Sequence, residues 1–380
     1  MIWPMFALTA ITPWHWAGFI VCVIVFLGLD LGVFHRRAHV VKFTEALAWT
    51  ALWVALSFLF AGALVPLRGK QEAIEFVTGY IIELSLSMDN VFVIALIFAY
   101  FRVPSRFQHR VLFWGILGAL VMRGVMIALG AALIERYTWM LYVFGAFLLF
   151  TGVRMLFADD ESVHPEKNPV LRLARKCFHV ADDFDGHKFT TLVQGRLALT
   201  PLALVLVVVE TTDLIFAVDS IPAIFAVTTK PFIVFTSNVF AILGLRSLYF
   251  ALAGAIDYFR YLKVGLAIVL AFIGAKMLVD PHGEEEKWFQ VDIATSVSLL
   301  TVGAIILTSI AFSITAAHRE KKAGRDKGAA SRKDTKGDAT GSGEKSTGQK
   351  SPAPPETKAT RDETDPSEQN GPLDKPGPPG

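Results

Sequence analysis

Cysteine and charge are both scarce in this sequence. Its 380 residues include two cysteines, Cys22 and Cys177, and only 18% of the residues are charged. One cysteine lies in an apolar run and the other in a polar segment, so neither a disulfide framework nor a thiolate metal site is expected. The first sixteen residues contain no Lys or Arg, whereas a cleaved signal peptide usually begins with basic residues. We therefore expect the first apolar run to be a retained membrane span.

Long apolar runs dominate what is present. Hydrophobic residues make up 53% of the chain, and apolar runs recur between residues 14 and 316. Because about 20 apolar residues are enough for a helix to cross a bilayer, we predict an all-α, polytopic membrane protein with about nine transmembrane helices. The predicted spans are 14–34, 45–65, 73–100, 111–134, 138–157, 198–221, 232–255, 261–279 and 290–316.

Three segments lie outside the spans. Residues 1–13 are predicted to form a short extracytoplasmic N-terminus, and residues 158–197 a long cytoplasmic loop within the transporter domain of residues 14–316. Residues 317–380 contain almost no aliphatic side chains. Such a segment cannot bury enough apolar surface to offset its ordering entropy, so we predict a disordered cytoplasmic tail. The loop and the tail are candidate surfaces for cytoplasmic or membrane protein partners.

The loop charges predict an orientation. The loop after the first span contains Arg36, Arg37 and Lys42, whereas the loop after the eighth is mostly acidic, with Asp280 and residues 284–286. Cytoplasmic loops carry an excess of Lys and Arg, so we predict an N-out, C-in arrangement in the bacterial inner membrane. The lipid bilayer is then the main partner, and the formal net charge of +2 gives no indication of nucleic-acid binding.

Two predicted spans contain acidic residues six positions apart. Glu83 and Asp89 lie in one span, and Asp213 and Asp219 lie in the other, with Glu210 one turn upstream. A charged side chain at the centre of a membrane helix costs about 3 kcal/mol or more. Two segments with matching acids therefore indicate a functional site, and a cation is its expected occupant.

These acids begin two longer blocks that resemble each other. Each block continues with a Gly and an Arg in the next span, and the third spans end in similar pentapeptides that start at Gly152 and Gly274. Three spans is an odd number, so the second block enters the membrane from the opposite side. We predict an inverted repeat of two three-helix units, repeat A at 73–157 and repeat B at 198–279, with a site near the midplane. The alternative is chance similarity between two apolar, glycine-containing segments.

The six-residue spacing limits how the acids can act. Residues six apart on a regular helix point about 120° away from each other, so Glu83 and Asp89 either serve two ion stations or lie on a broken helix. Pro222 follows Asp219 and could free carbonyl oxygens as ligands. Oxygen ligands suit Mg, Ca and Mn. The predicted metal ligands are Glu83, Asp89, Asn90, Glu210, Asp213 and Asp219.

Further residues are secondary candidates for the ion pathway. Met88 could favour a softer ion such as Mn²⁺, although packing is the simpler interpretation. Arg123 and Arg246 lie in predicted spans and could instead neutralise some acids as structural ion pairs. Asp30 either lines a cytoplasmic vestibule or lies at the interface near Arg36. The secondary set is Asp30, Ser85, Ser87, Met88, Arg123 and Arg246.

Three motifs carry a family resemblance. The segments Leu29–Phe34, Glu83–Val93 and Glu210–Ala223 resemble the signatures of the TerC family, and the resemblance covers about residues 14 to 316. The family is named after tellurium resistance. The resemblance implies a manganese exporter of the Alx-like branch, with LysE-type exporters as relatives. The acids that it places in the transport pathway are Glu83, Asp89, Glu210, Asp213 and Asp219. Met88 stands where the family pattern has a small aliphatic residue.

We therefore predict a membrane transporter that exports divalent metal cations, specifically Mn²⁺, by proton exchange through a midplane site of buried carboxylates. No permanently bound cofactor is expected, and Mn²⁺ is the predicted transported ion. The alternative is a membrane scaffold or chaperone linked to tellurite or metal stress resistance through its charged loop and tail. No nucleophile–base pair appears in the spans, so an enzyme is not predicted.

Overall fold

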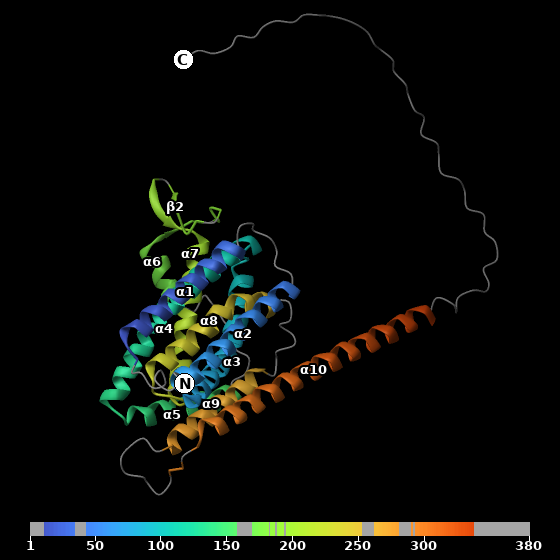
Figure 1. Cartoon of the computed structure of the whole chain (residues 1–380). Helices are drawn as coiled ribbons and strands as arrows, with labels where there is room; N and C mark the ends of the chain where they lie inside the picture. Colours follow the sequence, from blue (N-terminus) through green and yellow to red (C-terminus); the bar gives the residue numbers. More distant parts are fainter. Residues whose placement is uncertain are drawn as a thin grey trace, which may run out of the picture. The chain divides into compact units, whose positions relative to one another are not determined.

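Helices make up most of the computed structural model of this chain (Figure 1). It describes residues 11–34, 43–157, 169–181, 183–186, 188–193, 195–252, 262–280, 290–291 and 293–337. The chain divides into two units, residues 1–323 and 324–380. The helices are α1 (Pro13–Phe34), α2 (Phe43–Arg68), α3 (Lys70–Tyr100), α4 (Ser105–Arg136), α5 (Met140–Phe157), α6 (Pro169–Cys177), α7 (Pro201–Phe225), α8 (Pro231–Leu252), α9 (Leu262–Val279) and α10 (Thr295–Gly337).

Seven of the described helices are long and apolar enough to cross a membrane, namely α2, α3, α4, α5, α7, α8 and the Thr295–Ala316 part of α10. α1 contributes a shorter apolar stretch, Pro13–Leu29, and α9 has 18 residues with two lysines. The chain is thus a mostly helical, polytopic membrane protein. Each of the nine predicted spans coincides with a helix, and membrane crossing by α1 and α9 stays a prediction.

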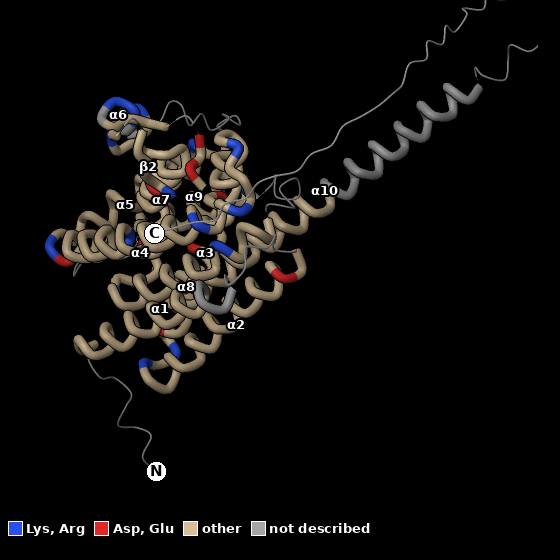
Figure 2. Tube along the Cα trace, turned by 90° about the horizontal axis from the view of Figure 1, so that it is seen from above, with Lys and Arg blue, Asp and Glu red and all other residues tan. Residues whose placement is uncertain are grey.

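The all-α prediction is wrong in one short segment of the predicted cytoplasmic loop. β1 (His179–Val180), β2 (Thr190–Val193) and β3 (Arg196–Leu199) form a sheet in the order β1-β3-β2. β1 runs parallel to β3, and β2 runs antiparallel to it. Strands of two to four residues are too short for a hydrophobic pattern to reveal. The sheet follows α6, on which Figure 2 shows a concentration of Lys and Arg.

The predicted chain ends fall mainly on residues that the structure does not describe. α10 continues to Gly337, past the predicted border of the tail at residue 317. Residues 338–380 and residues 1–10 lie outside the described part of the chain. The disordered tail and the extracytoplasmic N-terminus therefore stay predictions there.

α3 and α8 lie at the centre of the bundle. In α8, 89% of the apolar span is buried, against 17% in α10. α3 packs against α2, α7 and α8, and α4 packs against α7 and α8. Outer helices expose large apolar side chains such as Leu59, Leu129 and Phe150, which suits contact with lipid. Polar groups on α3 are therefore held inside the protein and away from the hydrocarbon.

Glycines allow α5 and α9 to cross at close range. A Cβ on Gly152 would lie 2.5 Å from the backbone nitrogen of Ala271 and 2.8 Å from the carbonyl oxygen of Ala267. On the other helix, a Cβ on Gly274 would collide with the backbone nitrogen of Leu149. Small residues commonly permit such backbone contact between membrane helices.

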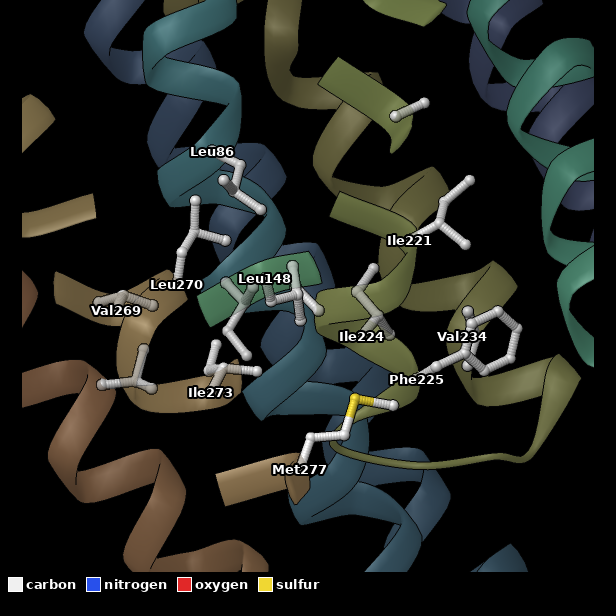
Figure 3. Packing of buried hydrophobic residues seen from close by; sticks show 14 of the residues in the cluster. Leu86, Leu148, Ile221, Ile224, Phe225, Val234, Val269, Leu270, Ile273 and Met277 are labelled. Atoms are coloured by element: carbon white, nitrogen blue, oxygen red, sulfur yellow. The ribbon is translucent and has the colours of Figure 1, made fainter. Parts of the chain in front are cut away.

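An apolar cluster surrounds this crossing. Leu148 of α5 and Met277 of α9 pack with Ile224 and Phe225 at the end of α7, and Leu86 of α3 joins them (Figure 3). The cluster contains side chains from both predicted repeats. The burial of these side chains stabilises the packing of α5 and α9 against the end of α7, a helix that carries three of the candidate acids.

Candidate functional site

A buried arginine joins two of the predicted acids. Glu83 of α3 is 0% exposed, Arg123 of α4 is 1% exposed and Asp213 of α7 is 9% exposed. The guanidinium of Arg123 donates from Nε and Nη2 to the two carboxylate oxygens of Asp213, at 3.1 and 3.0 Å, and from Nη1 to Oε1 of Glu83. A planar guanidinium matches a carboxylate in this bidentate way. Arg123 thus forms ion pairs with these two acids, and whether the pairs are only structural stays untested.

Two further polar side chains complete this group, which we call the Arg123 cluster. Ser220 accepts a hydrogen bond from Nη1 of Arg123 at 3.2 Å, and Asn90 donates to Oδ1 of Asp213 at 3.5 Å. Two buried acceptor oxygens, Oε2 of Glu83 and Oδ1 of Asn90, have no hydrogen-bond donor. Buried polar atoms are nearly always partnered. These two oxygens are therefore the places where the cluster can accept a proton, a water molecule or a cation.

A spacing of seven residues brings these groups together. Glu83 and Asn90 are seven apart on α3, and Asp213 and Ser220 are seven apart on α7. Seven residues make nearly two helical turns, so each pair lies on one helix face. Sequence reasoning missed Ser220, although the two pairs hold matching places in the two predicted repeats. The six-residue match between acids concealed this seven-residue pattern.

Glu210 lies one turn before Asp213 on α7, and its carboxylate rests against α4. A Cβ on Gly118 of α4 would overlap that carboxylate. Glycine at this position thus provides the space in which Glu210 lies. Glu210 is only half-buried, unlike Glu83, so it is the more accessible of the two.

The other predicted acids are also half-buried. Asp219 of α7 has Thr151 of α5 as a hydrogen-bond partner, and Asp89 lies on α3 next to Asn90. Within the described part of the chain, no three His, Cys, Asp or Glu side chains gather closely enough to hold a metal ion. The six predicted ligands therefore divide between the Arg123 cluster and half-buried positions, and they do not form one ready-made site in this conformation.

Of the two alternatives for the paired acids, the broken helix is wrong, because both helices concerned are described in full and neither is interrupted. α3 is continuous over 31 residues, and α7 is continuous over 25 residues through Pro222. The proline lacks an N–H, so the carbonyl of Val218 has no donor one turn later. The physical reason for continuity is that a proline near the last turn removes one hydrogen bond without requiring the helix to unwind.

The secondary candidates on α3 have mainly structural contacts. Ser85 is buried and donates to a backbone carbonyl one turn earlier at 2.6 Å. Ser87 is buried as well. Met88 packs beside a cluster of apolar side chains that includes Val91, which agrees with the packing interpretation.

The remaining secondary candidates lie on other helices. Arg246 of α8 is buried, and its Nη2 lies 3.2 Å from Nδ1 of His109 on α4. Asp30 belongs to α1, but its side chain lies outside the described part of the structure. Its assignment to a vestibule or to the interface stays open.

A polar cavity of about 520 Å³ lies where α3 and α8 begin and where α7 ends. Glu75, Lys230, Lys276 and Asp280 contribute to its lining. Nζ of Lys230 lies 3.2 Å from Oε2 of Glu75, and Nζ of Lys276 lies 3.1 Å from Oδ2 of Asp280. The predicted span 73–100 includes Glu75, but sequence reasoning did not name it as a site residue.

Glu75 and the Arg123 cluster share one face of α3. Glu75, Gly79, Glu83, Ser87 and Asn90 recur every three or four residues, and the four with side chains are all buried. This spacing is that of a single helix face. At 1.5 Å per residue, the Cα atoms of Glu75 and Glu83 are about 12 Å apart along the axis. One face of α3 thus carries both Glu75 of the cavity and the α3 residues of the Arg123 cluster.

Comparison with known proteins places the chain in a family. Residues 68–321 match the integral membrane protein TerC family. The chain belongs to the TerC family. A relative from Myxococcus xanthus, "Uncharacterized membrane protein STKORF319", is 51% identical over 80% of this chain and 92% of its own length. "Putative membrane-bound redox modulator Alx" from Escherichia coli K12 is 47% identical over 79% of this chain and 94% of its own length. No solved structure matches the chain.

The Salmonella typhi protein with the same Alx name is also 47% identical, over 82% of this chain and 97% of its own length. The aligned region covers nearly the whole length of each of these relatives, so the similarity extends over the helical bundle. This TerC-family chain is therefore a multi-pass membrane protein related to bacterial membrane proteins, as its motifs predicted.

Proposed function

We propose that this TerC-family protein exports divalent metal cations, specifically Mn²⁺, across the bacterial inner membrane. The Arg123 cluster carries the proposal, because two carboxylates lie deep in a membrane domain with two acceptor oxygens left without donors. Its ligand atoms are carboxylate, amide and hydroxyl oxygens, the donor types that suit Mn²⁺ and Mg²⁺. Replacement of a buried ion pair by apolar residues of similar volume is often neutral or stabilising, so stability alone does not explain such a group.

The contacts between helices support the predicted inverted repeat. Gly152 approaches the backbone of Ala271 and Ala267, and Gly274 approaches Leu149 and Gly145. Adding 122 to 152, 149 and 145 yields 274, 271 and 267, so the two sets of contacts exchange under one constant offset. The closest atoms are a backbone nitrogen, a carbonyl oxygen and a Cα in both sets. An approximate twofold axis between α5 and α9 explains this reciprocity.

The arrangement of the helix ends supports opposite insertion of the two repeats. The cavity gathers the starts of α3, α8 and α10 with the ends of α7 and α9. α3 therefore runs against α7, and the cavity lies at the end that the loop charges assign to the extracytoplasmic side. In an N-out, C-in protein, the polar face of α3 would lead the ion from the Arg123 cluster outward.

A flux assay tests the proposal. The purified protein in liposomes is expected to carry Mn²⁺ into a compartment with a quenchable dye, and a pH gradient is expected to change the rate if protons are exchanged. Glu83→Gln and Asp213→Asn should reduce the flux at least tenfold. Asp183→Asn, at an exposed acid beside the sheet, is the matched control and should leave the flux unchanged. Normal flux in both site variants would contradict the assignment.

A second candidate function uses the loop and tail. The relatives named Alx carry the words redox modulator in their names, and the sequence alternative is a scaffold or chaperone in tellurite or metal stress. The folded α6 and β-sheet segment, with exposed Arg172, Arg175 and Lys176, is a surface that a partner could bind. This candidate predicts that deletion of residues 320–380 abolishes stress resistance while Glu83→Gln leaves it intact.

A further inference from the structure

The carboxylates of the Arg123 cluster already have a positively charged partner, the guanidinium of Arg123. Both oxygens of Asp213, Oε1 of Glu83 and Oγ of Ser220 accept hydrogen bonds from one guanidinium. We propose that Arg123 is a tethered substitute for the transported ion: it occupies the carboxylates when no ion is bound, and the ion binds by displacing it. This inference rests on the proposed function and adds a competitor to its site.

Geometry requires the competition. Divalent cations such as Mg²⁺ and Ca²⁺ take oxygen ligands at about 2.0–2.6 Å in direct contact. The oxygens of Asp213 instead face guanidinium nitrogens at 3.0 and 3.1 Å, and the fork covers the edge of the carboxylate that an ion would bridge. An ion and the guanidinium cannot both occupy that edge, so binding of one excludes the other from that edge of Asp213.

The two unpartnered oxygens indicate where displacement begins. Oε2 of Glu83 and Oδ1 of Asn90 are buried acceptors that Arg123 leaves unused. Asn90 is held beside Asp213 by its own amide N–H at 3.5 Å. A cation can therefore contact Glu83 and Asn90 first, while Arg123 still holds Asp213, and acquire the Asp213 oxygens as the guanidinium withdraws.

Charge explains why a transporter would retain such a competitor. Two buried carboxylates without a counterion are strongly unfavourable. Arg stays protonated under all relevant conditions, so Arg123 offsets one of the two negative charges in every cycle. The empty site can then change its exposure to the two sides of the membrane at a lower cost than two bare carboxylates would impose.

If Arg123 were only a structural ion-pair partner, its removal would not strengthen Mn²⁺ binding. Measurement of Mn²⁺ binding therefore distinguishes this hypothesis from the substitute role. The full-length protein in detergent is titrated with Mn²⁺, and free Mn²⁺ is followed by its electron paramagnetic resonance signal. Arg123→Gln is expected to bind Mn²⁺ at least tenfold more tightly than the unmodified chain. Thermal unfolding provides the second readout: Arg123→Gln should unfold at a lower temperature without Mn²⁺ and should gain more from Mn²⁺ than the unmodified chain does.

Two variants complete the design. Arg123→Lys keeps the positive charge but loses the bidentate guanidinium. Its affinity for Mn²⁺ should therefore lie between that of the unmodified chain and that of Arg123→Gln. If Arg123→Gln does not fold, Arg123→Lys provides the test. Arg136→Gln changes an exposed arginine at the end of the same helix and should bind Mn²⁺ as the unmodified chain does.

The outcomes are distinguishable. If Mn²⁺ flux depends on Glu83 but folded Arg123→Gln or Arg123→Lys binds Mn²⁺ no more tightly than the unmodified chain, the substitute role is overturned and the proposed function stands. If neither the unmodified chain nor the variants bind or carry Mn²⁺, both are overturned. Tighter binding in Arg123→Gln together with slower flux is the result that supports the substitute role.

Discussion

The α5–α9 crossing and the Arg123 cluster occupy the same membrane domain but are built in different ways. At the crossing, Gly152 and Gly274 bring two backbones into contact, and a cluster of apolar side chains packs around the two helices. In the cluster, three helices meet through long polar side chains, and two acceptor oxygens stay without donors. Backbone contacts leave no room for adjustment, whereas side chains can exchange partners. The crossing is suited to holding the repeats together, and the cluster is suited to change.

Removal of the Asp213 carboxylate should have the largest effect on stability. Asp213→Ala leaves Arg123 with one carboxylate fewer in a buried site, and breaking a buried ion pair in this way costs about 3–5 kcal/mol. The unfolding temperature in detergent measures the loss. Asp213→Asn keeps the volume and some hydrogen bonding, so it should lose less. Equal stability of Asp213→Ala and the unmodified chain would mean that the cluster does not contribute to folding.

A methyl group added at the α5–α9 crossing should reduce the stability nearly as much as Asp213→Ala does. Gly274→Ala forces a Cβ against the backbone of α5, which cannot move away without separating the helices, and we expect a loss of about 3 kcal/mol. Gly303→Ala is the control on α10, because a Cβ there meets no atom within 4 Å. That control should be neutral or slightly stabilising. If Gly274→Ala and Gly303→Ala were equally stable, the α5–α9 crossing would not be rigid.

A glycine-to-alanine substitution beside the Glu210 carboxylate should reduce Mn²⁺ flux more than stability. In Gly118→Ala, the new Cβ meets the end of the flexible Glu210 side chain, which can rotate away, so the loss of stability should stay below about 1 kcal/mol. Mn²⁺ flux in liposomes should nevertheless fall several-fold, because the carboxylate leaves its position. Unchanged flux would exclude Glu210 from the pathway.

The smallest effect on Mn²⁺ is expected at Ser220. Ser220→Ala removes one neutral hydrogen-bond acceptor from Arg123, which still has both carboxylates. Because Arg123 is then held less tightly, Mn²⁺ binding should become up to a few-fold tighter in the same resonance titration. Weaker binding would instead make Ser220 a ligand of the ion.

Sequence patterns predicted the helices well and the contacts between them poorly. The nine apolar runs all became helices because about 20 consecutive apolar residues have few other stable forms in lipid. The two- to four-residue strands near Val180 and Leu199 were missed, since their pairing depends on partners up to twenty positions away. Of the candidate site, Glu83, Asn90 and Asp213 were named in advance as ligands and Arg123 as an alternative ion-pair partner, but Ser220 and the bidentate contact of Arg123 with Asp213 were not.

Composition and apolar run length by themselves predicted that this chain spans a membrane and that acids lie inside its helices, and its motifs resembled those of the TerC family to which it belongs. Only the tertiary structure decided that Arg123 holds both Glu83 and Asp213, that Glu210 lies against Gly118 and that Asp219 faces Thr151. The physical reason is that spacing along a helix defines which side chains share a face. Which helix that face meets depends on packing, here on glycines that let particular backbones approach.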